Sequence, residues 1–228
     1  MAAAFVAGVT GCTAGGDTET EAADAKVGGS TASPAPPGRY HTLLTPCRSV
    51  ERSTLKDLLP GVLTLPEDQQ QKVLRGTASP TFDTDRRAAC SWMSQAPDAS
   101  QQLRVDFERV VSYDPVVSDE SKAQGVFTKK QSAATGSLGG TPSTSGATGL
   151  EPRVLSGLGD AAYIDDVLAR ARSTAQRRTV TVVFRASNVI VTIDYTEQPA
   201  RVTKVPDSKE LQEKAQSLAR KLAELFDE

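Results

Sequence analysis

The alternation of apolar and polar residues predicts two β-strands in the first half of the chain. Within residues 102–112, Leu103, Val105 and Phe107 alternate with charged side chains, as in a strand that buries one face and exposes the other to water. Residues 89–94 also mix apolar and polar side chains and form the second candidate strand. One face of the sheet should therefore belong to the core, and the other should be hydrated.

A second pair of strands is predicted closer to the C-terminus. Residues 179–186 and 189–196 are rich in Val, Ile, Thr and aromatic residues, which suit a pleated, half-buried surface. Only Ser187 and Asn188 separate the two segments, and this spacing fits a two-residue hairpin turn. This hairpin is the strongest β signal of the chain.

Residues 207–227 give the strongest helix signal. Asp207 and Glu210 follow Pro206 and resemble a capping box, which satisfies the first free N–H groups of a helix. Apolar residues then recur at helical spacing and form one stripe. The stripe consists of Leu211, Ala215, Leu218, Leu222 and Leu225, and we expect it to cover the sheet.

Three shorter helices are expected upstream, at residues 49–59, 66–76 and 119–130. The last of them has acidic residues in its first turn and lysines in its last turn, as the helix dipole favours. The order of elements lacks a regular β-α-β alternation. The sequence therefore predicts the α+β class, with a mostly antiparallel sheet and helices packed on one face.

The N-terminus carries the pattern of a lipoprotein signal. Val9, Thr10 and Gly11 precede Cys12, as required for cleavage before a cysteine that carries a diacylglyceryl group. Residues 1–11 would be a truncated signal peptide, because they contain an apolar stretch but no Lys or Arg. Two acyl chains, such as palmitate, on Cys12 would anchor the protein stably to a membrane. The alternative is an unmodified cysteine in a disordered tail.

Low-complexity segments divide the rest of the chain. Residues 12–39 consist almost entirely of small and polar residues after Cys12, and they predict a disordered tether. Residues 40–228 should form a single α+β domain. A second stretch of Gly, Ser and Thr, at about residues 137–149, predicts a mobile loop on the surface of that domain.

Two cysteines remain once Cys12 is assigned to lipid. An even number of cysteines in an exported protein indicates a disulfide, so we predict a bond between Cys47 and Cys90. These two residues and the single, distant His41 do not supply the four ligands of a zinc site. No metal or cofactor is expected.

Four motifs follow the Cys12 pattern in a fixed order. They are Pro46-Cys47, Cys90-Ser91-Trp92, Gly157-Leu158-Gly159-Asp160-Ala161-Ala162-Tyr163 and the amphipathic C-terminal helix. From about Thr45 to the C-terminus, this combination resembles a family of exported actinobacterial lipoproteins known as a domain of unknown function. The resemblance implies a lipid-anchored, extracytoplasmic α+β domain with one disulfide and no established activity.

Trp92 is the first candidate for contact with a ligand, because an indole offers a stacking face and one hydrogen-bond donor. Trp92 lies two residues from Cys90, and therefore on the same face of a strand. The alternative is that the ring packs over the disulfide. In Gly157-Leu158-Gly159, the two glycines indicate a tight turn rather than a phosphate loop, since no third glycine opens a helix.

The densest basic cluster of the chain is formed by Arg170, Arg172, Arg177 and Arg178. They could bind an anionic polymer or a lipid headgroup, or they could protect a solvated edge strand by their charge. Asp165 and Asp166 could act as a carboxylate pair. However, adjacent residues of a strand point to opposite faces, and the alternative is a solvated loop.

The sequence shows no catalytic constellation. Its net charge of −2 and its isoelectric point near 5.6 give no reason to expect nucleic acid as a partner. The leading hypothesis is a non-enzymatic binding or sensing module, anchored by lipid on the extracytoplasmic face of the cell membrane. Its partner would be a small ligand or an unknown envelope protein. The alternatives are an accessory docking subunit of an envelope enzyme or transporter, and a cell-wall hydrolase.

Overall fold

The computed structural model describes residues 34–81, 83–136, 152–169 and 175–227. Cys12 and most of the expected tether lie outside the described residues, as does the loop expected at residues 137–149. The helices are α1 (Pro46–Ser49), α2 (Arg52–Leu58), the 3₁₀ helix η1 (Pro60–Thr64), α3 (Glu67–Arg75), α4 (Asp119–Gly136) and α5 (Ser208–Asp227). The strands are β1 (Thr77–Ala78), β2 (Arg87–Gln95), β3 (Ala99–Arg109), β4 (Arg153–Leu155), β5 (Ala161–Ala169), β6 (Arg177–Ala186) and β7 (Val189–Pro199).

The described strands form one antiparallel sheet in the order β1-β2-β3-β7-β6-β5-β4. The predicted hairpin is present as β6 and β7, joined at Ser187 and Asn188. The predicted α+β class and the mostly antiparallel sheet are confirmed. Because β3 pairs with β7, the hairpins β2–β3 and β6–β7 form the centre of the sheet.

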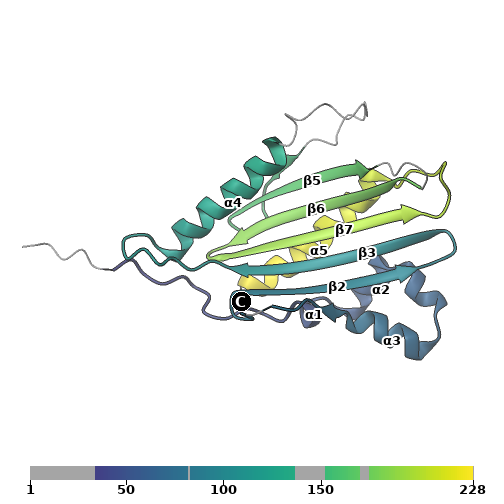
Figure 1. Cartoon of the computed structure of the whole chain (residues 1–228), viewed down its shortest axis with the longest axis horizontal. Coiled ribbons are helices and arrows are strands. Elements are labelled where there is room, and N and C mark those ends of the chain that lie inside the picture. The colour runs from purple at the N-terminus through teal and green to yellow at the C-terminus, as the bar shows by residue number, and fades with distance from the viewer. Residues whose placement is uncertain (1–33, 82, 137–151, 170–174, 228) are drawn as a thin grey trace, which may run out of the picture. The chain divides into compact units, whose positions relative to one another are not determined.

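One face of the sheet is covered by α5 and by the helices that precede β1 (Figure 1). The N–H of Glu210 donates to the Asp207 carboxylate at 2.7 Å, so the predicted cap begins α5. The buried stripe of α5 packs on alternate residues of β6 and β7, and each fully buried Leu or Phe side chain stabilises the fold by about 1.5–3 kcal/mol. The buried apolar side chains of α5 are Leu211, Ala215, Leu218, Ala219, Leu222, Ala223 and Phe226.

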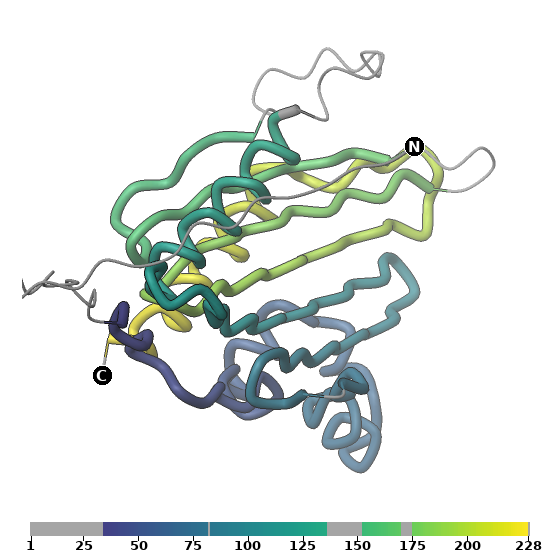
Figure 2. Tube along the Cα trace, turned by 60° about the vertical axis from the view of Figure 1, so that its left-hand side comes forward, coloured from purple at the N-terminus to yellow at the C-terminus, as the bar shows by residue number. Residues whose placement is uncertain are grey.

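Helix α4 lies on the other face of the sheet, in front of the strands in Figures 1 and 2. Its buried residues Ala123 and Phe127 pack against Tyr163, Val183 and Ile190. These three strand residues alternate with the ones that face α5, so they belong to the opposite face. The helices are therefore not all on one face, although α4 covers only one end of the second face.

Residues 34–40 form a docked segment that is bound to the domain ahead of α1. The N–H of Gly38 donates to Asp119 at 3.0 Å, and the backbone of Tyr40 forms two hydrogen bonds of 2.9 Å with the Asn188 side chain. Asn188 is fully buried, and a Cβ added to Gly38 would lie 2.3 Å from its Cγ. The folded domain thus begins earlier than the expected boundary at residue 40.

Candidate functional site

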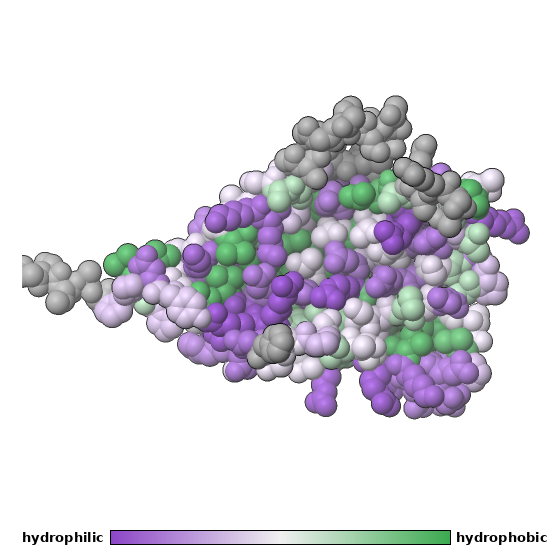
Figure 3. Space-filling model, in the orientation of Figure 1, coloured by the Kyte–Doolittle hydropathy of each residue, from purple (hydrophilic) through white to green (hydrophobic). Residues whose placement is uncertain are grey.

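The face of the sheet opposite α5 is only partly covered by α4, and we call its uncovered part the open face. Along β3, residues Arg104 and Asp106 point to this face, while the intervening Val105 is fully buried against the helices on the other side. The open face comprises Arg87, Ala89, Ser91 and Met93 of β2, Gln102, Arg104, Asp106 and Glu108 of β3, Thr192, Asp194 and Thr196 of β7, Thr179 and Thr181 of β6, and Asp165 and Val167 of β5. Figure 3 shows this face, where hydrophilic residues gather over β2 and β3.

Two arginines hold one carboxylate on the open face. Arg87 donates from Nε and Nη2 to Asp106 at 3.3 Å, and Arg104 donates from Nη2 to the same carboxylate at 3.0 Å. The Asp106 side chain is 8 % exposed, whereas those of Arg87 and Arg104 are 61 % and 37 % exposed. The hydrogen bonds to Asp106 also raise the pKa of Arg87. The cluster therefore presents cationic groups to solvent and shelters its anionic group.

A hollow of about 300 Å³ lies beside this cluster at the β1 side of the sheet, and we call it the edge hollow. Ala89 is buried and contributes a small side chain there, and Arg104 Nη1 donates to Ser79 Oγ at 3.0 Å. The lining residues are Ser79, Pro80, Thr81, Arg87, Ala89, Arg104 and Asp106. The edge hollow thus combines hydroxyl and guanidinium groups with a little apolar surface.

Two further carboxylates lie in the same transverse row as Arg104. In the register of the sheet, Asp165 and Asp194 flank Thr181, and Asp194 lies opposite Arg104. Burial raises the pKa of both carboxyls, although Thr181, which donates to Asp194 at 2.7 Å, opposes the shift there. The intervening strand β6 separates Asp165 from Asp194, and neither residue lines the edge hollow.

The predicted disulfide is present, with Cα atoms of Cys47 and Cys90 5.2 Å apart. It joins α1 to β2. Trp92 is 2 % exposed, and its indole N–H donates to the Leu74 carbonyl at 3.3 Å. The indole ring is thus part of the core and is not accessible to a ligand. This burial agrees with the alternative in which the ring packs in the core near the disulfide.

The predicted basic cluster is divided by the structure. Arg170 and Arg172 lie outside the described residues, and Arg177 is exposed at the start of β6. Arg178 is buried instead, and its Nη1 lies 2.8 Å from Asp166 Oδ1. Strand β6 lies between β5 and β7, so the alternative of a solvated edge strand is wrong. The solvated-loop alternative for Asp166 is wrong as well.

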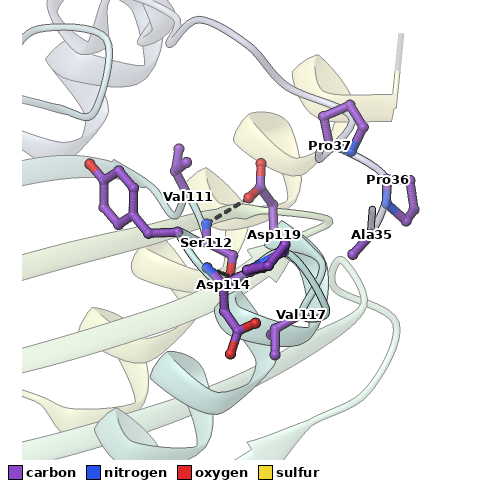
Figure 4. A pocket seen from close by; sticks show the side chains of 10 residues that line it. Ala35, Pro36, Pro37, Val111, Ser112, Asp114, Val117 and Asp119 are labelled. Atoms are coloured by element: carbon purple, nitrogen blue, oxygen red, sulfur yellow. Dashed lines mark hydrogen bonds between the residues drawn. The ribbon is translucent and has the colours of Figure 1, made fainter. Parts of the chain in front are cut away.

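A second hollow of about 300 Å³ lies between the docked segment and residues 111–119 (Figure 4). Pro36 and Pro37 lie on one side of it, and Asp119 lies between the two segments. The Asp119 oxygens already accept from the N–H groups of Gly38 and Ser112. This carboxylate therefore fixes the docked segment, and among the described residues no arginine or lysine lines this hollow.

The sequence pattern indicates that Arg104 and Asp106 lie on a hydrated face, but it does not indicate their partner. Arg87 joins the cluster only because the register of β2 against β3 places Ala89 opposite Asp106. A shift of β2 by one residue against β3 would move Arg87 to the other face of the sheet. In a hairpin the length of the turn sets this register, so the length of the β2–β3 turn is the sequence feature that predicts the pairing.

No helix among the described residues is long and apolar enough to cross a membrane. In the same part of the chain, no three His, Cys, Asp or Glu residues are placed to hold a metal ion. No protein-family model matches the chain, and no curated protein sequence matches it significantly.

Proposed function

We propose that this protein is a non-enzymatic binding module, anchored by lipid on the extracytoplasmic face of a cell membrane, and that its ligand binds to the open face. The pattern that ends at Cys12 supports the anchor. The Cys47–Cys90 disulfide supports an oxidising compartment, because disulfides persist mainly in exported proteins.

The observation that carries the proposal is the edge hollow with its two arginines. A hydrated face alone is common in antiparallel sheets and would carry no function. Here, however, Arg87 and Arg104 converge beside a hollow and remain partly exposed, while Asp106 between them is sheltered. Concave sites with a few convergent polar groups are typical of ligand binding.

An accessory docking subunit is the second candidate function, and the open face favours it less. A docking surface usually presents a contiguous apolar patch. On the open face, the exposed large apolar residues are Met93 of β2 and Val167 of β5, and three strands separate them. A cell-wall hydrolase is the third candidate. It would need carboxylates that meet in a cleft, whereas Asp165 and Asp194 are separated by β6.

The anchor is tested by expression of the full chain in a bacterial host that processes lipoproteins. Wild-type protein should partition into the detergent phase. Cys12→Ser should remain an unprocessed precursor, because the lipid must be attached before the leader is cleaved. Equal aqueous partitioning of the two forms would refute the lipid anchor.

Ligand binding is tested by amide NMR of the full chain carrying Cys12→Ser, titrated with a soluble extract of the host envelope. The proposal predicts saturable shifts on β2, β3 and β7, around the open face. A control titration with cytosolic extract should leave these amides unchanged. Shifts confined to the outer surface of α5, or no shifts, would contradict the proposal.

A further inference from the structure

We infer that the edge hollow binds a singly charged oxyanion group of a ligand, a carboxylate or a phosphodiester. This inference rests on the proposed function, because it assigns a ligand chemistry to the open face. It depends on three properties of the hollow: the hydrogen-bond donors that remain, the local charge and the available space.

The first property is the supply of donors. A guanidinium carries five N–H groups, and the hydrogen bonds of Arg87 to described residues use only Nε and Nη2. Arg104 uses one N–H on Nη1 for Ser79 and one on Nη2 for Asp106. Both arginines therefore retain donors beside the hollow. The hydroxyl of Ser79 accepts from Arg104 and can add its own O–H, whereas the hydroxyl of Thr81 already donates to the Asp83 carbonyl.

Asp106 cannot supply a matching set of acceptors. Its Oδ1 accepts from Arg87, and its Oδ2 accepts from both arginines. Its side chain is almost completely sheltered from solvent. A ligand in the edge hollow therefore meets mainly donors, which an oxyanion satisfies with short, charge-assisted hydrogen bonds.

The second property is the charge around the hollow. Two guanidinium groups and one carboxylate leave one positive charge among its lining residues. Glu108 is near Arg87 but is paired with Lys130 at 3.1 Å, and Asp194 is near Arg104 on the far side from the hollow. The single net positive charge of the lining residues therefore balances a monoanion better than a dianion.

The third property is space. The volume of about 300 Å³ greatly exceeds the share of one water molecule, about 30 Å³ in the liquid. The hollow can thus accept a charged group together with part of the ring or chain that carries it. Strand β1 has only two residues and forms the edge of the sheet, so a longer ligand can continue past this edge.

The test uses the full chain carrying Cys12→Ser and defined probes: glucuronate, dimethyl phosphate, inorganic phosphate at pH 8 and uncharged methyl glucoside. We expect saturable amide shifts at Arg87, Ala89 and Arg104 with either monoanion, and dissociation constants on the order of 1 mM, typical of a small ligand. The phosphate dianion should bind more weakly, and methyl glucoside should cause no shift. The tighter monoanion identifies the source as a carboxylate or a phosphodiester.

Arg87→Gln and Arg104→Gln should each weaken binding about tenfold or more, since each removes a charge-assisted hydrogen bond. Arg201→Gln is the matched control, because Arg201 is exposed in the turn before α5. This variant should bind the monoanions with the same affinity as wild type. Arg87 is the more exposed arginine, so its variant should fold even if Arg104→Gln does not.

Three results would overturn the inference: no saturable shift with either monoanion, an equal response to methyl glucoside, or unchanged affinity in Arg87→Gln. If envelope extract still shifts amides of the open face, then only the oxyanion chemistry is wrong. If neither the extract nor the monoanions shift these amides, the proposed function fails together with the inference.

Discussion

The buried ion pair between Asp166 and Arg178 gives the sharpest prediction about the scaffold. Their side chains are only 2 % and 5 % exposed. Asp166 Oδ2 also accepts from Ser208 Oγ at 2.5 Å and from Gln212 Nε2 at 2.6 Å, so the pair fastens the first turns of α5 to the sheet. The perturbation is Asp166→Asn, which keeps the shape of the side chain and removes its charge.

This substitution should leave the Arg178 guanidinium buried without a compensating charge. Breaking a buried pair in this way typically costs about 3–5 kcal/mol. Arg178→Met should cost less, because Ser208 and Gln212 still donate to the carboxylate. The double variant removes both charges and should be more stable than Asp166→Asn alone, since paired burial of charge is itself expensive.

Urea unfolding measures these differences directly. For a small domain the slope is about 2 kcal/mol per M of urea, so Asp166→Asn should lower the midpoint by about 1.5–2.5 M. Glu210→Gln is the control, because the exposed pair of Glu210 with Lys214 should contribute at most about 1 kcal/mol. A midpoint within the error of wild type, or a double variant that shows the sum of both losses, would refute the reasoning.

Three further predictions concern other parts of the structure. Replacing both Cys47 and Cys90 by Ser opens a loop with a sequence separation of 43 and should cost about 4 kcal/mol in urea unfolding; an unchanged midpoint would contradict it. Burial raises the pKa of Asp194 above its ordinary 3.8, so the free energy of unfolding of wild type, relative to that of Asp194→Asn, should fall as the pH rises from 3.8 through the raised pKa. A difference between the two proteins that does not change with pH would show that Asp194 is solvated. Asn188→Ala removes two hydrogen bonds to the backbone of Tyr40 and should speed limited proteolysis within the docked segment. An unchanged cleavage rate would show that other contacts hold this segment.

Local patterns in the sequence predict the central hairpin and the last helix, because both signals lie within short segments. The turn at Ser187 and Asn188 separates two β-rich runs, and the stripe that includes Leu218 has a strict helical period. The stripe matches burial at Leu218, which is 1 % exposed, but it is wrong at Leu225, which is 39 % exposed, while the neighbouring Phe226 is buried in its place. In these elements the local preference and the tertiary packing agree.

The side of the sheet on which α4 packs could not be predicted from α4 itself. Its inward residues include Ala123 and Phe127, and their partners Tyr163, Val183 and Ile190 come from three different strands. Contacts between such distant residues depend on the strand order and register, which a single sequence does not specify. Helix position is here a property of the whole sheet.

The same limit applies to the charged groups. Arg177 and Arg178 are neighbours in one basic cluster, yet the first is exposed and the second is buried with Asp166. Arg87 and Asp106 are 19 residues apart and meet through the β2–β3 register. Sequence analysis therefore identifies a hydrated strand face, while the candidate site on it appears only once the strands are paired.

The central claim is that the open face contacts a ligand in the cell envelope, and photo-crosslinking on intact cells tests it most directly. A photoreactive amino acid replaces Met93, which is 57 % exposed on the open face, or Glu224, which is exposed on α5. The account predicts a discrete adduct with the probe at Met93, competed by free ligand or envelope extract, and none with the probe at Glu224. An adduct at Glu224 alone, or equal adducts at both positions, would contradict it.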